Sequence, residues 1–178
     1  MPIFLPTPYT VKTSTRPSCK KEAFNFQNSL KKLCTLRTVE NMNYFLGHVD
    51  FENIDTITDI CIFKEGIEPL WEDQANINGG KWIIKVKREV VVRLFQKMMV
   101  HLLVDTFESL KVNGIVMSFR VRNAMITLWT NAEKNNERVI QEIKKILDID
   151  FYLAIEYKDN STSLQDKSSF RNTKTHNA

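Results

Sequence analysis

The sequence is poor in the residues that build metal centres and disulfide frameworks. Its three cysteines, Cys19, Cys34 and Cys61, are an odd number at unrelated spacings, and its three histidines are scattered. Zinc sites use cysteine and histidine ligands in closely spaced pairs, which this chain lacks. We therefore expect no metal site and reduced thiols.

Long apolar runs are also missing. No stretch of about eighteen apolar residues occurs, and the N-terminus has neither the charged start nor the apolar stretch of a secretory signal. These absences predict a cytoplasmic protein without membrane contact.

Catalytic motifs are scarce as well. The chain has no nucleophile elbow, no P-loop and no carboxylate pair with a clear substrate geometry. The pair Gly79-Gly80 lacks the rest of a phosphate-cradling loop. We expect a binding protein that needs no cofactor, rather than an enzyme.

The middle of the chain has no excess of positive or negative charge. The formal net charge is +4, but residues 24–157 hold 17 basic and 18 acidic residues. Binding to long phosphate backbones needs an extended positive surface, so any nucleotide recognition must be local. The excess lies in residues 1–23, which contain four of the five prolines, and in the mostly polar residues 158–178. Both are predicted to be flexible tails around one domain, residues 24–157.

The spacing of apolar residues predicts an α+β domain between these tails. Thr38 is the expected N-cap of a short amphipathic helix that ends near Gly47. A strand at 81–87 has one apolar face and one largely basic face. The other predicted elements are a strand at 59–63, a long helix from 89 to about 110, a hairpin of strands at 114–122 and 125–130, a helix at 132–147 and a last strand at 151–157.

Trp71 and Glu72 stand side by side in a proline-containing loop between two predicted strands. An exposed indole offers a flat, electron-rich face to a flat cation, and the neighbouring carboxylate can accept two parallel hydrogen bonds from a guanine edge. Methylation of guanine at N7 makes the base cationic and adds to stacking worth roughly 1–3 kcal/mol per base. Taken alone, the pair is a weak signal, because a tryptophan in a loop is more often a partly buried packing residue.

Two longer motifs surround this pair. Gly66-Ile-Glu-Pro-Leu-Trp-Glu-Asp and Gly79-Gly80-Lys81-Trp82 resemble the cap-loop signature of the eukaryotic translation initiation factor 4E family, and the resemblance extends from about Phe24 to Tyr157. It implies a strongly curved antiparallel β-sheet backed by helices, with the 7-methylguanosine cap of messenger RNA bound on the concave face.

The resemblance also implies roles for the aromatic residues. Trp71 would form one side of an aromatic sandwich, and Glu72 would accept hydrogen bonds from the guanine edge. The opposite side, usually a tryptophan, falls on Phe26, with Phe24 as the alternative, which predicts weaker stacking. Trp129 would close over the N7 methyl group.

For the cap phosphates the resemblance implies Arg120 and Arg122, with Lys81 at a third basic position. From pattern alone, Arg120 and Arg122 also fit a half-solvated strand. Met125 stands where the family has a lysine. One phosphate contact is therefore missing unless Lys81 or a residue of a tail compensates.

The surface opposite the cap site, called here the dorsal surface, binds a helical peptide of a scaffold factor in this family. The aligned partner-binding positions are Val39, Asn43, Gln96 and Leu103. Asn43 replaces a tryptophan, so the scaffold-type contact loses an aromatic anchor for the peptide.

Three hypotheses remain: a cap-binding initiation factor, a cap-binding repressor that does not recruit the scaffold factor, and a cap-hydrolysing enzyme. The first is favoured. The expected partners are capped messenger RNA and a scaffold factor or another helical peptide, and the protein is expected to be a monomer.

Overall fold

The computed structural model describes residues 1–16, 24–51, 53–54, 58–121, 123–131, 137–149, 153–168 and 173–177. Its centre is an eight-stranded sheet with the order β2-β1-β3-β5-β6-β4-β7-β8, in which all paired neighbours are antiparallel. The strands are β1 (Phe4–Thr15), β2 (Lys31–Thr38), β3 (Thr58–Lys64), β4 (Gly80–Val86), β5 (Val112–Phe119), β6 (Ala124–Thr130), β7 (Ala154–Asp159) and β8 (Lys174–Asn177).

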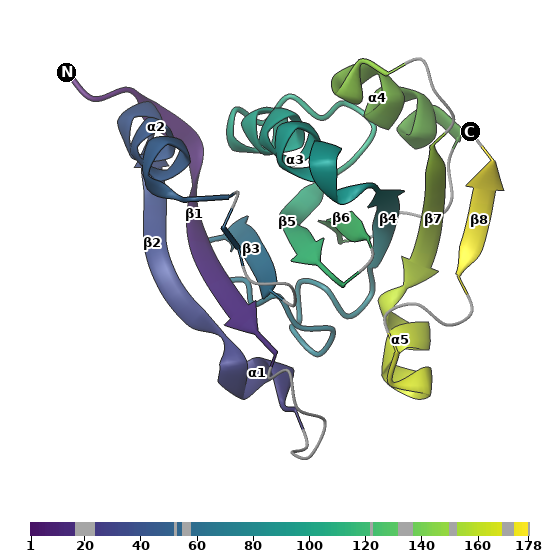
Figure 1. Ribbon diagram of the computed structural model, residues 1–178. Helices are drawn as coiled ribbons and strands as arrows, with labels where there is room; N and C mark the ends of the chain where they lie inside the picture. Colours follow the sequence, from purple (N-terminus) through teal and green to yellow (C-terminus); the bar gives the residue numbers. More distant parts are fainter. Residues whose placement is uncertain are drawn as a thin grey trace.

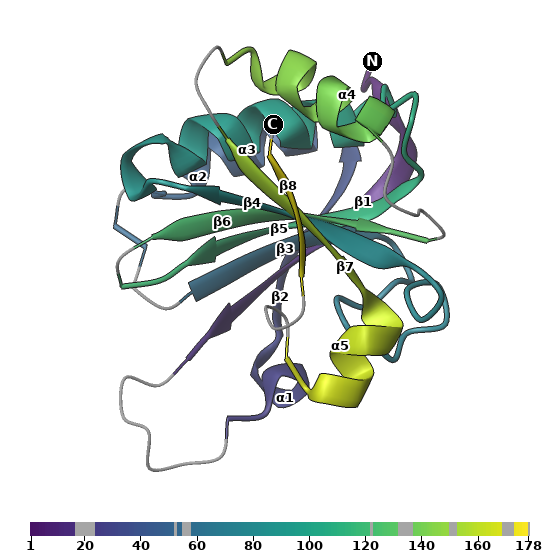
Figure 2. The same cartoon turned by 90° about the vertical axis from the view of Figure 1, so that its right-hand side faces the viewer.

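The helices lie on both sides of this sheet (Figures 1 and 2). Helices α2 (Val39–His48), α3 (Arg88–Leu103) and α4 (Glu137–Leu147) gather on one side, and the short helices α1 (Phe26–Ser29) and α5 (Asn160–Asp166) lie on the other. In α3 the buried residues Val91, Phe95 and Met98 recur at helical spacing and face the sheet core. No helix in the described ranges is both long and apolar enough to cross a membrane.

Alternation along the central strands gives the sheet two different faces. In β6, Ile126 and Leu128 belong to the large core beneath the helices. Thr127 and Trp129 point to the opposite side, since successive side chains of a strand alternate between faces. The second face holds a smaller apolar cluster around Phe63 and Trp129. This face carries the candidate site.

The predicted cap of α2 is confirmed. The Thr38 side chain accepts a hydrogen bond from the backbone N–H of Asn41, and the helix runs to His48. By contrast, α3 ends at Leu103, earlier than the predicted position near 110. Asp105 has a φ of 55°, which is incompatible with a continuing right-handed helix.

The prediction of a flexible N-terminal tail is wrong for residues 4–15, which form β1 between β2 and β3. Tyr9 and Val11 are fully buried, and the Tyr9 hydroxyl donates to the Leu102 carbonyl at 2.9 Å. The prolines at positions 6 and 8 fall where the pairing with β2 is irregular, between Phe4 and Tyr9. Such irregular positions tolerate proline within a sheet.

The C-terminal prediction also needs correction. Strand β7 extends to Asp159 and is followed directly by α5, and residues 174–177 pair with β7 as β8. Asn160 and Ser163 of α5 are buried although both are polar. The polar composition of residues 158–178 suggested a flexible tail, because composition does not show which polar residues are buried. Residues 17–23 and 169–172 lie outside the described residues.

Candidate functional site

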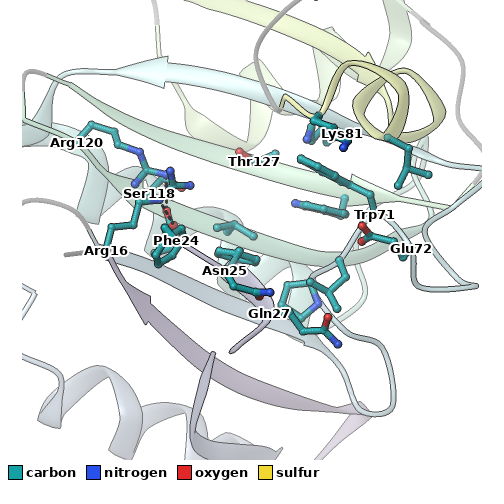
Figure 3. A pocket seen from close by; sticks show the side chains of 18 residues that line it. Arg16, Phe24, Asn25, Gln27, Trp71, Glu72, Lys81, Ser118, Arg120 and Thr127 are labelled. Carbon is teal, nitrogen blue, oxygen red and sulfur yellow. Dashed lines mark ion pairs between the residues drawn. The ribbon is translucent and has the colours of Figure 1, made fainter. Parts of the chain in front are cut away.

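A cavity of about 910 Å³ opens on the sheet face opposite to α2, α3 and α4. It brings together residues that lie far apart in the sequence (Figure 3). Six of the residues singled out from the sequence line it: Phe26, Trp71, Glu72, Lys81, Arg120 and Trp129. Arg122 lies outside the described residues.

The loop between β3 and β4 holds Trp71 and Glu72 in place. Asn76 is fully buried, and its side-chain amide donates to the carbonyls of Glu68 at 2.8 Å and Leu70 at 3.0 Å. These bonds fix the chain just before the indole, which is half-buried, while Glu72 is exposed at the rim. Among the described residues, no hydrogen bond or ion pair occupies the Glu72 carboxylate. It is therefore available to a ligand.

Two further asparagines support the loop and were not identified from the sequence. Asn113 donates from Nδ2 to the Ala75 carbonyl at 2.8 Å and to Asn76 Oδ1 at 3.0 Å. Asn160 donates from Nδ2 to the Asn76 carbonyl at 2.8 Å. They come from β5 and α5, and a single asparagine at the end of an element gives no periodic signal.

Gly79 and Gly80 serve close packing. A Cβ atom on Gly79 would lie 1.8 Å from the Thr130 carbonyl oxygen, and one on Gly80 would lie 2.3 Å from the Tyr157 hydroxyl. Glycine is the residue that allows such approach of a backbone. The pair thus joins the loop to β6 and β7.

The aromatic side chains form the apolar walls of the cavity. Phe26 opens α1, behind the N-cap Asn25, and packs with Trp71 against the cluster around Phe63 and Trp129. Phe24 also lines the cavity, with its ring centroid 6.5 Å from that of Phe26, so both predicted alternatives are present. The buried Trp129 Nε1 has no hydrogen-bond partner among the described residues.

The other end of the cavity is basic, and Figure 3 shows Arg16 and Arg120 there, away from Trp71 and Glu72. Arg120 pairs with the buried Asp59 at 2.8 Å, and Arg16 Nε lies 4.0 Å from the same carboxylate. Burial, and then the nearby Arg120, lower the pKa of Arg16, while Asp59 acts in the opposite direction. Two guanidinium groups share one carboxylate, which leaves positive charge for an anion.

Arg16 was missed because it follows β1, in a segment predicted to be a tail. Its guanidinium carbon lies 4.9 Å from the centroid of the Phe24 ring, so stacking helps to orient it. The family lysine position, Met125, is buried on the same sheet.

Lys81 differs from its predicted surroundings. The predicted basic face of β4 is covered at Lys81, which is only 2% exposed because the rings of Trp71 and Trp129 lie against its amine and α5 packs beside β4. Its Nζ lies 4.9 Å from the Trp71 ring centroid and 5.2 Å from that of Trp129. Burial, and then the charge of Lys158, lower its pKa from 10.5 to about 7, and Asp166 opposes the shift.

On the dorsal surface, the structure changes one of the predicted contacts. Leu103 is fully buried and belongs to the core, so in this conformation it offers nothing to a partner. Val39 packs against the same core in part, Gln96 is half-buried, and Asn43 is exposed.

The fold and the cavity define an α+β protein that presents an aromatic and basic ligand site on one face of an antiparallel sheet. A family profile described as Eukaryotic initiation factor 4E matches residues 5–175. The chain belongs to this family.

Individual relatives agree with this assignment. The eukaryotic translation initiation factor NCBP of Triticum aestivum is 34% identical over 164 residues, which cover 89% of this chain and 71% of the relative. The eukaryotic translation initiation factor 4E-4 of Caenorhabditis elegans is 29% identical over 171 residues, covering 93% and 80%. The resemblance noted from the sequence is confirmed.

Solved structures show the same fold. Ascaris suum eIF4E-3, in complex with the m7G cap, superposes with a TM-score of 0.77 at 24% identity and covers 89% of this chain and 92% of its own. C. elegans eIF4E-3, in complex with the 4E-binding protein Mextli, superposes with a TM-score of 0.81 at 21% identity and covers 98% and 100%. The predicted fold class, a curved antiparallel sheet with helices, is confirmed.

Proposed function

We propose that this protein binds the 7-methylguanosine cap of messenger RNA in the cavity and acts in translation initiation. The observation that carries the proposal is the pairing of Trp71 with the unoccupied carboxylate of Glu72 at one rim of the cavity. The indole stacks on the cationic base while the carboxylate accepts hydrogen bonds from the guanine edge. Phe26 lines the same cavity and completes the aromatic walls around the base.

The cap phosphates extend toward the basic end of the cavity. Arg120 and Arg16 supply guanidinium groups there, and the forked donors of arginine suit phosphate oxygens. Arg16 takes over the contribution that Met125 cannot make. Asp59 holds both side chains at this end before a ligand arrives.

A relative solved with the m7G cap supports this proposal, and so does the name of the wheat relative, an initiation factor. A second structural neighbour was solved in complex with a 4E-binding protein. For this chain the matching partner is a helical peptide of a scaffold factor, bound on the dorsal surface. The protein would work in the cytoplasm.

One observation favours a second candidate, a cap-binding repressor. Asn43 is exposed where the family has an anchoring tryptophan, and Leu103 is buried in the core. Neither residue offers a partner an exposed apolar anchor, which weakens the dorsal surface as a site for the scaffold peptide. A protein that keeps the cap site and lacks that contact would sequester messages instead of recruiting ribosomes.

The test is a tryptophan fluorescence titration with 7-methyl-GTP and with GTP. Trp71 and Trp129 line the cavity and should be quenched by the methylated nucleotide. Trp71→Ala and Glu72→Gln should each lose most of the affinity, whereas Glu65→Gln, in the same loop and outside the cavity lining, should bind as the unchanged protein does. Equal binding of the two nucleotides would refute the proposed cap recognition.

A further inference from the structure

Lys81 is an amine held deep in the cavity wall. Its side chain is only 2% exposed, and its Nζ makes no hydrogen bond to any described residue. The nearest groups that can favour its positive charge are the ring faces of Trp71 and Trp129, at 4.9 and 5.2 Å. A buried ammonium normally keeps a carboxylate or several carbonyls around it.

The charged groups around Lys81 do not provide that neutralisation. On β7, the buried Lys158 adds a like charge, and its own Nζ lies 2.7 Å from Asp166 of α5. Lys167, just after α5, adds another positive group to the cavity lining.

The carboxylates of the cavity are placed elsewhere. Glu72 lies at the exposed rim of the β3–β4 loop, and Asp59 of β3 is engaged by Arg120 and Arg16 at the far end. Within the described part of the chain, the cavity thus offers Lys81 two aromatic faces and no counter-ion of its own.

We propose that Lys81 couples ligand binding to proton uptake: the empty cavity holds it partly as a neutral amine, and the phosphates of a bound nucleotide draw a proton from solvent onto it. The step forms one N–H bond, converting the amine to an ammonium, and the solvent or buffer loses that proton. The inference rests on the proposed function, because it needs an anionic ligand in this cavity.

The direction of the effect follows from the charges. In the empty protein the pKa of Lys81 is about 7, lowered chiefly by burial. A phosphate nearby favours the ammonium and raises this pKa, so the loaded protein binds more protons than the empty one. Affinity therefore falls as pH rises through 7. For a single group of this kind the loss is about tenfold between pH 6 and pH 8.

Arginine at this position would not behave in the same way. A guanidinium stays charged at every pH in this range, so it would interact with the phosphates without exchanging a proton. Lys81→Arg therefore keeps a positive group and removes the titration. Lys81→Met removes both and has a side chain of similar length.

The experiment is isothermal titration calorimetry with 7-methyl-GTP at pH 7, run in buffers of different ionisation enthalpy. The dependence of the heat on buffer gives the number of protons taken up on binding. The ligand's own ionisable groups contribute to every variant alike, so the difference between the unchanged protein and Lys81→Arg isolates Lys81. We expect the unchanged protein to take up about half a proton more than either variant.

Equal proton uptake by the unchanged protein and by a variant that binds would overturn the inference while leaving cap binding intact. Absence of 7-methyl-GTP binding by the unchanged protein would refute both proposals. Should one variant fail to fold, the other serves the same comparison. The affinity for 7-methyl-GTP between pH 6 and pH 8 adds a second readout: the unchanged protein should lose about tenfold more affinity over this range than Lys81→Arg or Lys81→Met, and an equal pH dependence would contradict the proposal.

Discussion

Replacing Lys81 by methionine should make the empty protein more stable while it weakens nucleotide binding. In the unfolded chain the amine has its ordinary pKa of 10.5, and in the folded protein the pKa is about 7. At pH 7, folding must therefore remove a proton from this amine in part of the molecules. At about 1.4 kcal/mol per pKa unit, the cost is about 4 kcal/mol at pH 7 and about 2 kcal/mol at pH 9.

The difference in bound protons between the unfolded and the folded state decides the pH range over which stability changes. Between pH 7 and 10.5 the unfolded state binds more protons at Lys81 than the folded state, so this contribution to stability improves as pH rises. Methionine has a similar shape and no charge, and it removes the cost at every pH. The stability gain of Lys81→Met should therefore be about half as large at pH 9 as at pH 7.

Urea unfolding followed by circular dichroism at pH 7 and pH 9 measures both effects. Comparing the two proteins at each pH removes the contributions of other titrating groups, among them the buried Cys61. Lys87→Met is the control, because Lys87 is exposed and its replacement should change stability by no more than about 0.5 kcal/mol. A Lys81→Met protein that is less stable, or whose advantage does not shrink at pH 9, would refute the reasoning.

Three further predictions concern the walls of the cavity. Phe26→Trp should bind 7-methyl-GTP several-fold more tightly in fluorescence titrations, because indole stacks better on a cation; unchanged or weaker binding would contradict the place given to Phe26. Arg16→Ala should bind more weakly and with a smaller salt dependence, measured over a series of salt concentrations; an unchanged salt slope would exclude a phosphate contact. Asn76→Ala should lower stability by about 2 kcal/mol in urea unfolding, because it removes two side-chain hydrogen bonds to the part-buried carbonyls of Glu68 and Leu70 and also removes an acceptor of the Asn113 amide; an unchanged stability would mean that these bonds do not hold the loop.

Local patterns were enough to identify much of the fold. Thr38 followed by amphipathic spacing located α2, and the alternation of Ile126 and Leu128 with Thr127 and Trp129 located β6 and its two faces. The motifs around Trp71 and Gly79 located the site. Each of these signals is contained in a few consecutive residues, which is why it is visible without the structure.

The features that sequence could not supply depend on distant parts of the chain. The strand β1 pairs with β3, whose residues lie about fifty positions away, and its prolines disguised it as a tail. Lys81 is buried by Trp71, Trp129 and α5, which come from other parts of the chain. The alternating lysines of β4 carry no sign of this cover and therefore suggested an exposed face. Leu103 looked like a partner contact because helical spacing does not say which apolar residue faces the core.

The cavity also links segments that lie far apart in the sequence. Its lining begins at Arg16, beside the β1–β2 edge of the sheet, and ends at Lys167, after α5 near the opposite edge. During synthesis the site is incomplete until Lys167 has been added and α5 can fold beside the sheet, so nucleotide binding reports that both sides of the sheet are in place. A ligand that touches both sides ties the first strands to the last ones. At about a hundred times its dissociation constant it would stabilise the folded state by about 2.7 kcal/mol.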